Sequence, residues 1–337
     1  MPTWNRHKYL LSTLQHLLPQ LNERCEVLII DNASDTPVEG YLAENLPQKD
    51  AGPFVFRVIR NRANIGIGAN ILRCLEMSMG EWTWMIGDDD APCSDALSKI
   101  LKEVEGFDGV FVNFSCASSK LKAQVGSGVL EFLESSVTWV GMAFLPLIVH
   151  KTKEVQETLF FAYNTLSSAN PHAAAMLLAI GEKGNWKFSS SEIVTRMVLP
   201  AEERWNTLKG LARTVFFPEQ LIEILSNKER ALLSKKILHD LGMNSFKSLY
   251  IIFYQTLMHI TKMPEDYELC KFYFYQWVYK SSGKGVRFRS INLFAKILYY
   301  ALVYHRTSFF IFQLYNFARM RRLRPYKVFG NIKRKDF

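Results

Sequence analysis

The sequence predicts an α/β protein built on an open sheet, followed by a mainly helical region. Three short apolar runs each stop at a polar loop, and stretches with helical spacing lie between them. In an open α/β sheet the ligand binds at the carboxyl ends of the strands, so these polar loops lie where a ligand site is expected. Beyond about Leu208 the apolar spacing is helical only.

The first elements alternate between helix and strand. His7–Leu18 repeats leucine with helical spacing, which predicts a helix packed on a sheet. The runs Glu26–Ile30 and Phe54–Arg60 predict buried strands. Helical spacing resumes at Ile71 and continues to Met79, which predicts the next helix.

The later elements are less regular. Trp82–Ile86 predicts a third strand, which runs into three consecutive aspartates. Phe107–Phe114 predicts another strand, Ala173–Ile180 predicts a short apolar helix, and Lys187–Val198 predicts a returning strand.

Composition excludes several classes of protein. The 337 residues are 48% hydrophobic and 22% charged, which supplies a core and excludes a disordered chain. The five cysteines form no CxxC pair, so we expect neither a zinc site nor disulfides, but a reducing cytosolic compartment. The first residues do not predict a targeting sequence, and no apolar run reaches the length of about 18 residues that predicts a membrane-spanning helix.

The positive charge belongs to the end of the chain. Of the net charge of +9, residues 1–244 contribute −4 and residues 245–337 contribute +13, and this last part interleaves aromatic with basic residues. We expect the segment from about Ser245 to Arg324 to bind an anionic membrane surface without crossing it. A helical core with solvated charges is the alternative, and nucleic-acid binding lacks a recognised motif.

Three adjacent aspartates, Asp88–Asp90, are the strongest local signal. Neighbouring carboxylates repel one another unless a cation lies among them, and ligands that are all oxygen suit Mg²⁺ or Mn²⁺. A metal that bridges a diphosphate is one use of such a group. A solvated acidic turn before a helix is the alternative.

Four ordered segments surround this acidic motif: Pro2-Thr-Trp-Asn-Arg6, Ile29-Ile-Asp-Asn-Ala-Ser-Asp35, Asn61–Asn70 and Gly80–Asp90. With them the chain resembles the family 2 glycosyltransferases of the GT-A fold, and most closely the branch that includes abequosyltransferase-like enzymes of bacterial surface polysaccharides. The resemblance is specific over residues 2–92, weakens up to about residue 205 and is absent beyond it.

The resemblance implies a division of the chain. Residues 1–118 would form the nucleotide-sugar-binding half of a Rossmann-like mixed sheet, and residues 119–210 the acceptor-binding half. Residues 211–337 would form a helical, basic and aromatic extension that associates with the membrane.

The resemblance also implies which residues bind the donor. Those expected to contact the nucleotide sugar are Pro2, Thr3, Asn5, Arg6, Asp31, Asn64, Gly66, Asp88 and Asp89. Asp31 is expected to accept a hydrogen bond from the base. Asp88 and Asp90 are the outer positions of the DXD motif: Asp88 would lie near ribose or metal, and Asp90 would be the principal ligand of Mg²⁺ or Mn²⁺.

One departure from the family concerns the first strand. Met1 stands where family members end a hydrophobic strand, immediately before the Pro2–Arg6 loop. We therefore expect either a sheet that lacks this strand or a Val/Ile-rich segment upstream of Met1.

A second departure concerns the catalytic base. Asn170-Pro171-His172 stands where the family has an acidic pair at a helix start, which makes His172 the expected base. The alternative is that His172 only caps or packs, and weaker substitutes are Asp108, Glu154 and Glu157. Arg204 and Trp205 correspond to an element that contacts phosphate or acceptor, with a surface helix anchored by the tryptophan as the alternative.

Together these features predict an inverting glycosyltransferase. It would transfer a sugar from a UDP-, dTDP- or CDP-sugar to a lipid-linked oligosaccharide or polysaccharide, with Mg²⁺ or Mn²⁺. It would work as a peripheral protein on the inner face of a bacterial cytoplasmic membrane and would bind no nucleic acid. The alternative is a catalytically degenerate GT-A scaffold in a polysaccharide-assembly complex.

Overall fold

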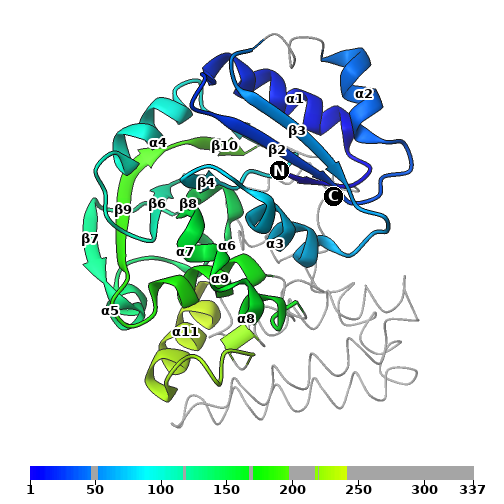
Figure 1. Cartoon of the computed structure of the whole chain (residues 1–337). Helices are drawn as coiled ribbons and strands as arrows, with labels where there is room; N and C mark the ends of the chain where they lie inside the picture. Colours follow the sequence, from blue (N-terminus) through cyan, green and yellow to red (C-terminus); the bar gives the residue numbers. More distant parts are fainter. Residues whose placement is uncertain (47–51, 117–118, 167–169, 197–216, 219, 241–337) are drawn as a thin grey trace, which may run out of the picture. The chain divides into compact units, whose positions relative to one another are not determined.

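The computed structural model describes residues 1–46, 52–116, 119–166, 170–196, 217–218 and 220–240 (Figure 1). The chain divides into two compact units, one formed by Met1–Pro200 with Gln220–Leu232, the other by Ala201–Glu219 with Leu233–Phe337. All the described elements lie in the first unit, except that α11 continues into the second. The predicted basic and aromatic segment after Ser245 lies outside the described residues.

Helices and strands alternate through the first unit, which confirms the predicted α/β class. The helices are α1 (His7–Leu17), α2 (Val38–Asn45), α3 (Ile67–Met77), α4 (Ala96–Val104), α5 (Gly128–Glu134), α6 (Trp139–Ala143), α7 (Thr152–Gln156), α8 (Leu159–Tyr163), α9 (Pro171–Ile180) and α11 (Asn227–Asp240), with short 3-10 turns η1 (Leu18–Gln20) and η3 (Leu145–Leu147). The strands are β1 (Pro2–Thr3), β2 (Glu26–Asp31), β3 (Val55–Arg60), β4 (Trp82–Trp84), β5 (Asp90–Pro92), β6 (Phe111–Ser115), β7 (Gln124–Ser127), β8 (Ile148–Lys151), β9 (Asn185–Glu192) and β10 (Val194–Arg196).

The first sheet is parallel and has the order β1-β2-β3. β2 is buried on both faces because helices cover it: in Figure 1, α1 and α3 lie to either side of β2 and β3. Leu28 and Ile30 of β2 pack against Ile71, Leu72 and Leu75 of α3. The apolar run and the helical spacing therefore predicted these two elements correctly.

The start of the chain does pair with this sheet. Pro2 lies opposite Ile30 and Thr3 opposite Asp31, and the Ile30 and Asn32 backbone N–H groups donate to the carbonyls of Met1 and Thr3 at 2.9 Å each. The expectation of an absent first strand is thus corrected to a two-residue strand. Because it is so short, it fixes only the residues that lead into the Asn5–Arg6 loop.

The second sheet is mixed, with the order β4-β8-β6-β9-β7. α4 covers one face through Ala96, Ile100 and Val104, which form one core cluster with Val112 and Phe114 of β6 and Val149 of β8. On the opposite face of this sheet, Phe111 contacts Phe132 of α5, and Phe132 also contacts Trp186 and Phe188 of β9. α9 is buried almost all round, as expected of a helix that is apolar on every face.

The predicted third strand is shorter than expected. β4 ends at Trp84, and the chain then forms a turn from which β5 begins at Asp90. β5 pairs antiparallel with β10, with Asp90 opposite Arg196. A tertiary pairing thus places the third aspartate in a short strand rather than in a loop.

Candidate functional site

The acidic turn Gly87–Asp90 lies against the start of the chain. The Thr3 hydroxyl donates to Asp88 Oδ2 at 2.7 Å, and Arg6 Nη1 lies 3.0 Å from Asp88 Oδ1 and 2.9 Å from Asp89 Oδ2. The Arg6 guanidinium also lies over the ring of Tyr9, 5.3 Å from its centroid. The structure therefore brings Thr3, Arg6, Asp88 and Asp89 together, as the resemblance implies.

Asp90 differs from its two neighbours because its side chain turns back on its own loop. Its Oδ2 accepts a hydrogen bond from the Gly87 backbone N–H at 2.7 Å. Asp88 and Asp90 are both buried, with exposed fractions of 5% and 8%. These two buried carboxylates form the core of the site, and Asp88 is held there by Thr3, 85 residues earlier in the chain.

Burial and like charge shift the protonation of this turn. Burial raises the pKa of Asp88 to about 6, against the opposing charge of Arg6. Burial and the neighbouring Asp89 charge raise the pKa of Asp90 to about 7. A nearby cation would favour the ionised forms of both groups, so the turn has the electrostatics of a cation site.

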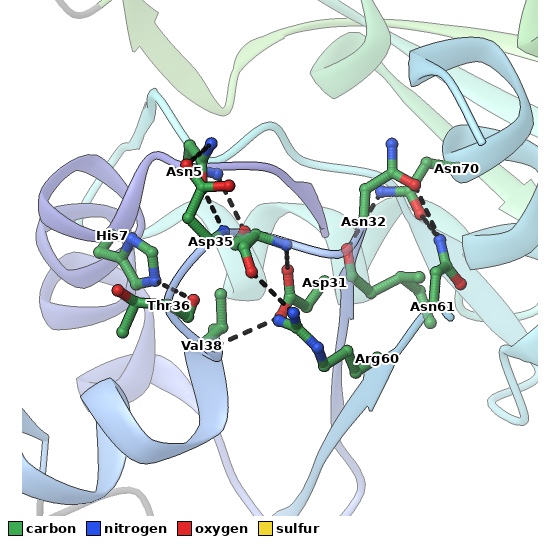
Figure 2. A network of polar contacts seen from close by, with 12 residues as sticks. Asn5, His7, Asp31, Asn32, Asp35, Thr36, Val38, Arg60, Asn61 and Asn70 are labelled. Atoms are coloured by element: carbon green, nitrogen blue, oxygen red, sulfur yellow. Dashed lines mark hydrogen bonds and ion pairs between the residues drawn. The ribbon is translucent and has the colours of Figure 1, made fainter. Parts of the chain in front are cut away.

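A second polar network surrounds the loop that follows β2 (Figure 2). The Asn5 backbone N–H donates to Ser34 Oγ at 2.9 Å, and its side chain exchanges hydrogen bonds with Asp35. Arg60 Nη1 pairs with Asp31, and its Nη2 donates to the Ser34 carbonyl at 2.7 Å. These contacts hold the loops after β1, β2 and β3 together at the carboxyl edge of the first sheet.

Asp31 lies at the centre of this network and is 1% exposed. Its Oδ1 accepts from the Ser34 backbone N–H at 2.8 Å, and its Oδ2 accepts from Val38 and Arg60. Burial favours its neutral form, but the hydrogen bonds from Ser34, Val38 and Arg60 outweigh burial and hold the pKa of Asp31 below its ordinary value. Asp31 thus organises the loop and the start of α2, and its contact with a nucleotide base stays a prediction.

Asparagines join β2, β3 and α3. Asn61 Nδ2 donates to Asn32 Oδ1 at 3.0 Å and to Asn70 Oδ1 at 2.8 Å, and Asn70 Nδ2 donates to the Ile30 carbonyl. Asn32 Nδ2 donates to Asn64 Oδ1, which also accepts from the Gly66 backbone N–H at 2.9 Å. The loop that carries the predicted donor residues Asn64 and Gly66 is therefore fixed from the sheet side.

Gly66 precedes α3 with φ 83° and ψ 156°, a conformation that L side chains rarely adopt. We expect Gly66→Ala to lower the free energy of unfolding by about 1–3 kcal/mol through backbone strain alone, because no atom lies within 4 Å of the added Cβ. Urea titration measures this loss. Gly40→Ala is the matched control: Gly40 is exposed on α2 with equal space around it, so alanine there should stabilise by about 0.5–1 kcal/mol. Equal changes at both positions would contradict the strain argument.

His172 lies in the core rather than at an open site. It is 3% exposed in the first turn of α9, and its Nε2 donates to the Ala143 carbonyl at 2.9 Å. That bond fixes the tautomer and leaves Nδ1 as the lone-pair nitrogen, which is buried without a hydrogen-bond partner. Burial also lowers the pKa of His172 to about 4. A base must reach the acceptor hydroxyl, so we replace the predicted catalytic role with a structural one.

We therefore expect the His172→Gln variant to retain most of the wild-type turnover. The glutamine Nε2–H can replace the imidazole Nε2–H toward Ala143, whereas an amide cannot accept a proton as a base. Turnover should fall less than about tenfold, against the roughly 10²–10⁴-fold loss expected on removal of a general base. Initial rates of the folded variant decide this, and a loss in the larger range would restore the catalytic assignment.

The predicted alternative bases, which the structure describes, make no hydrogen bond or ion pair with the acidic turn. Arg204 and Trp205 lie outside the described residues. Asp108, Glu154 and Glu157 are exposed, the first before β6 and the other two in or next to α7. Pro2 contributes its backbone to β1.

Several residues of the site carry no sequence signal of their own. Arg60 is the last residue of a predicted strand, and Asn32, Asn61 and Asn70 belong to the segments that resemble the family. Their hydrogen bonds, however, join residues from different elements, which the sequence does not indicate. Thr13, on the buried face of α1, hydrogen-bonds the backbone of the acidic turn. A polar residue among the leucines of an amphipathic helix is the signal that could have indicated it.

The segment of the chain that contains this site is similar to known proteins. Residues 1–127 match the family model described as Glycosyl transferase family 2. This segment is a family 2 glycosyltransferase domain. It includes β1, the loop after β2, the Gly66 loop and the acidic turn, so every described residue predicted to bind the donor falls within it.

One curated relative and two solved structures extend this glycosyltransferase comparison. The abequosyltransferase RfbV of Salmonella typhimurium is 32% identical over 100 residues, which span 29% of each chain, so the match covers less than a third of that relative's length. The Staphylococcus aureus TarS fragment 1–349 in complex with UDP-GlcNAc superposes with a TM-score of 0.54 at 12% identity, over 89% of this chain and 88% of that one. The mannosyltransferase PcManGT of Pyrobaculum calidifontis, in complex with GDP-Man and Mn²⁺, gives 0.53 at 11% identity, over 90% and 86%. These structural matches establish a shared fold, the GT-A fold that the sequence predicted.

Among the residues that the structure describes, no helix is long and apolar enough to cross a membrane.

Proposed function

We propose that this protein is a glycosyltransferase that transfers a sugar from a nucleotide-sugar donor to a glycan acceptor. The observation that carries the proposal is the buried acidic turn, held by Thr3 and Arg6 within a family 2 glycosyltransferase domain. The turn lies beside the carboxyl ends of β1 and β2, where ligands bind in open α/β sheets.

The donor class follows from the same surface. The TarS and PcManGT structures hold UDP-GlcNAc and GDP-Man, and both share the fold of this chain. For this chain we propose a UDP-, dTDP- or CDP-sugar that contacts the loops of Thr3–Arg6, Asp31 and Asn64–Gly66, with Asp88 and Asp89 near the ribose. The hydrogen bonds that fix these loops in advance would lower the cost of ordering them around the donor.

The carboxylate oxygens of the acidic turn are ligands that suit Mg²⁺ or Mn²⁺. Among the described residues, no three acidic, histidine or cysteine side chains converge as a complete metal site. Mg²⁺ does not need one, because it is commonly held by one or two carboxylates together with substrate phosphates. Asp90 would be the principal ligand and Asp88 the second. Burial is the main cause of the raised pKa of both carboxyl groups, and a divalent ion would favour their ionised forms.

The proposed reaction is a single displacement with inversion at the anomeric carbon. An acceptor hydroxyl attacks that carbon, its proton passes to a base, and the bond to the nucleoside diphosphate breaks. A divalent ion bound with the diphosphate supplies charge that stabilises this leaving group. Arg6, which is 29% exposed at its side chain, can contribute positive charge at the same edge.

The acceptor and the location are proposed from composition. A lipid-linked oligosaccharide or polysaccharide at the inner face of a bacterial cytoplasmic membrane suits a chain whose last 93 residues carry a net charge of +13 and many aromatic residues. The RfbV relative is an abequosyltransferase, and we propose a related role in surface polysaccharide synthesis. The protein would bind that membrane peripherally.

Release of nucleoside diphosphate tests the proposal. Full-length protein is incubated with a panel of UDP-, dTDP-, CDP- and GDP-sugars, Mn²⁺ or EDTA, and a bacterial lipid extract as acceptor. We expect release for one donor class, dependent on both metal and lipid extract. Absence of release from every donor would overturn the proposed activity.

A non-catalytic scaffold is the second candidate, and the burial of His172 favours it, since no other base lies at the acidic turn among the residues that the structure describes. Calorimetry with the same nucleotides separates the two. A scaffold binds nucleotide or nucleotide sugar without releasing diphosphate, whereas an enzyme does both.

A further inference from the structure

α1 contacts the acidic turn at a point that no motif indicates. The Thr13 hydroxyl lies 2.9 Å from the Asp88 carbonyl oxygen and 2.8 Å from the Asp90 carbonyl oxygen. We propose that Thr13 is a positioning residue, whose hydroxyl fixes the backbone of the turn so that the Asp88 and Asp90 carboxylates meet the metal–diphosphate group of the donor. This inference rests on the proposed function.

The geometry requires the two carbonyls to converge. A threonine hydroxyl carries one proton, so it donates to one carbonyl at a time or shares the proton between both. Either arrangement requires that the Asp88 and Asp90 carbonyls point at the same atom, across the intervening Asp89. Fixing these two carbonyls fixes the peptide planes that follow Asp88 and Asp90, and so restricts the directions of the side chains of the turn.

The carboxylates show the consequence. With its carbonyl on Thr13, Asp88 directs its carboxylate to Thr3 and Arg6, while Asp90 directs its own to the Gly87 N–H. The contacts to the Asp88 carboxylate come from β1 and the loop after it, whereas Thr13 of α1 contacts the backbone of the turn. Together with the pairing of Asp90 opposite Arg196, Thr13 therefore holds the backbone of the turn independently of the charges on it.

Packing alone does not explain a hydroxyl at this position. Thr13 is fully buried on the face of α1 that also carries Leu10, Leu14 and Leu17, where an apolar side chain would pack as well. A buried hydroxyl costs free energy unless it is hydrogen-bonded, and helical threonines commonly bond a carbonyl of the preceding turn. Thr13 instead donates to carbonyls 75 and 77 residues further along the chain.

Three variants test the proposal. Thr13→Val keeps the shape and removes the hydroxyl, and Thr13→Ser keeps the hydroxyl. Thr152→Val is the matched control, because Thr152 is also buried and its hydroxyl bonds only Thr83, 2.8 Å away in β4. Mn²⁺ affinity in the presence of UDP is measured by calorimetry, and hydrogen exchange is measured on peptides that cover residues 85–92.

We expect Thr13→Val to weaken Mn²⁺ binding in the presence of UDP about tenfold, the equivalent of one lost hydrogen bond, and to speed exchange in the turn. Thr13→Ser should stay within about threefold of the wild type, and Thr152→Val should bind Mn²⁺ normally even where its stability falls. Wild-type affinity in folded Thr13→Val, or equal losses in the valine and serine variants, would overturn the positioning role. If the wild type binds neither Mn²⁺ nor UDP, the proposed function fails instead, and unchanged exchange in Thr13→Val would then show that Thr13 does not hold the turn either.

Discussion

Asp90→Asn is expected to abolish metal-dependent transfer and, at pH 8 without metal, to stabilise the protein. Asparagine keeps an oxygen that can accept from the Gly87 N–H but removes the charge that a divalent ion needs. We expect turnover to fall by at least about 10²-fold, the range seen when one electrostatic contact to a transition state is removed. The rate of diphosphate release with Mn²⁺ measures this loss.

The stability gain depends on pH in a defined direction. Burial and the Asp89 charge raise the pKa of Asp90 to about 7, so its contribution to stability is fully present below its unfolded pKa near 4 and is lost as the pH rises through 7. The advantage of Asp90→Asn over wild type should therefore be absent below about pH 4, grow as the pH rises toward about 7, and reach about 1–3 kcal/mol at pH 8 without metal. Saturating Mn²⁺ should reverse it, since only the wild type gains that ligand.

Asp95→Asn is the matched control for Asp90→Asn. Asp95 is exposed and pairs with Lys99 one turn along α4, so its replacement should leave both the free energy of unfolding and the turnover close to those of the wild type. Full metal-dependent activity in Asp90→Asn, or a lower stability of this variant at pH 8 without metal, would contradict the assignment of Asp90.

Arg6→Gln is expected to produce the largest loss of stability at this site. Arg6 is the cation that pairs with both Asp88 and Asp89, and Asp88 is buried. Removing one partner of a buried pair leaves an uncompensated charge, which costs about 3–5 kcal/mol when both groups are fully buried. Because the Arg6 side chain is 29% exposed, we expect about 2 kcal/mol at pH 8 in EDTA.

The loss in Arg6→Gln should shrink in acid. The pKa of Asp88 is raised to about 6 in the presence of Arg6, so at pH 5 its carboxyl is mostly neutral and needs no cation. Urea titrations of both proteins at pH 5 and pH 8 measure the difference, and Arg6→Lys should restore part of it because it keeps the charge. Equal losses at both pH values, with no rescue by lysine, would show that Arg6 acts by packing on Tyr9 rather than through its charge.

The sequence alone determined the elements of the first half and the position of the acidic turn. Leucine spacing predicted α1, apolar runs predicted β2 and β3, and the motifs of residues 2–92 predicted a family 2 domain that the comparison of residues 1–127 supports. These signals are local, because the spacing of apolar residues in a helix and the apolar run of a buried strand are both patterns of neighbouring residues. The two-residue β1 and the short β4 were less well predicted, since the extent of a strand depends on its partner.

The tertiary structure alone decided what each polar side chain contacts. It gave Asp31 three partners, one in its own loop, one at the start of α2 and one in the next strand. It also placed His172 in the core and set the Thr13 hydroxyl against two carbonyls 75 and 77 residues away. Such contacts form between segments that only the completed fold brings together, so no spacing in the sequence encodes them. A carboxylate, an imidazole or a hydroxyl has the same composition whether it binds a ligand or its own chain, and the neighbours supplied by the fold decide between the two.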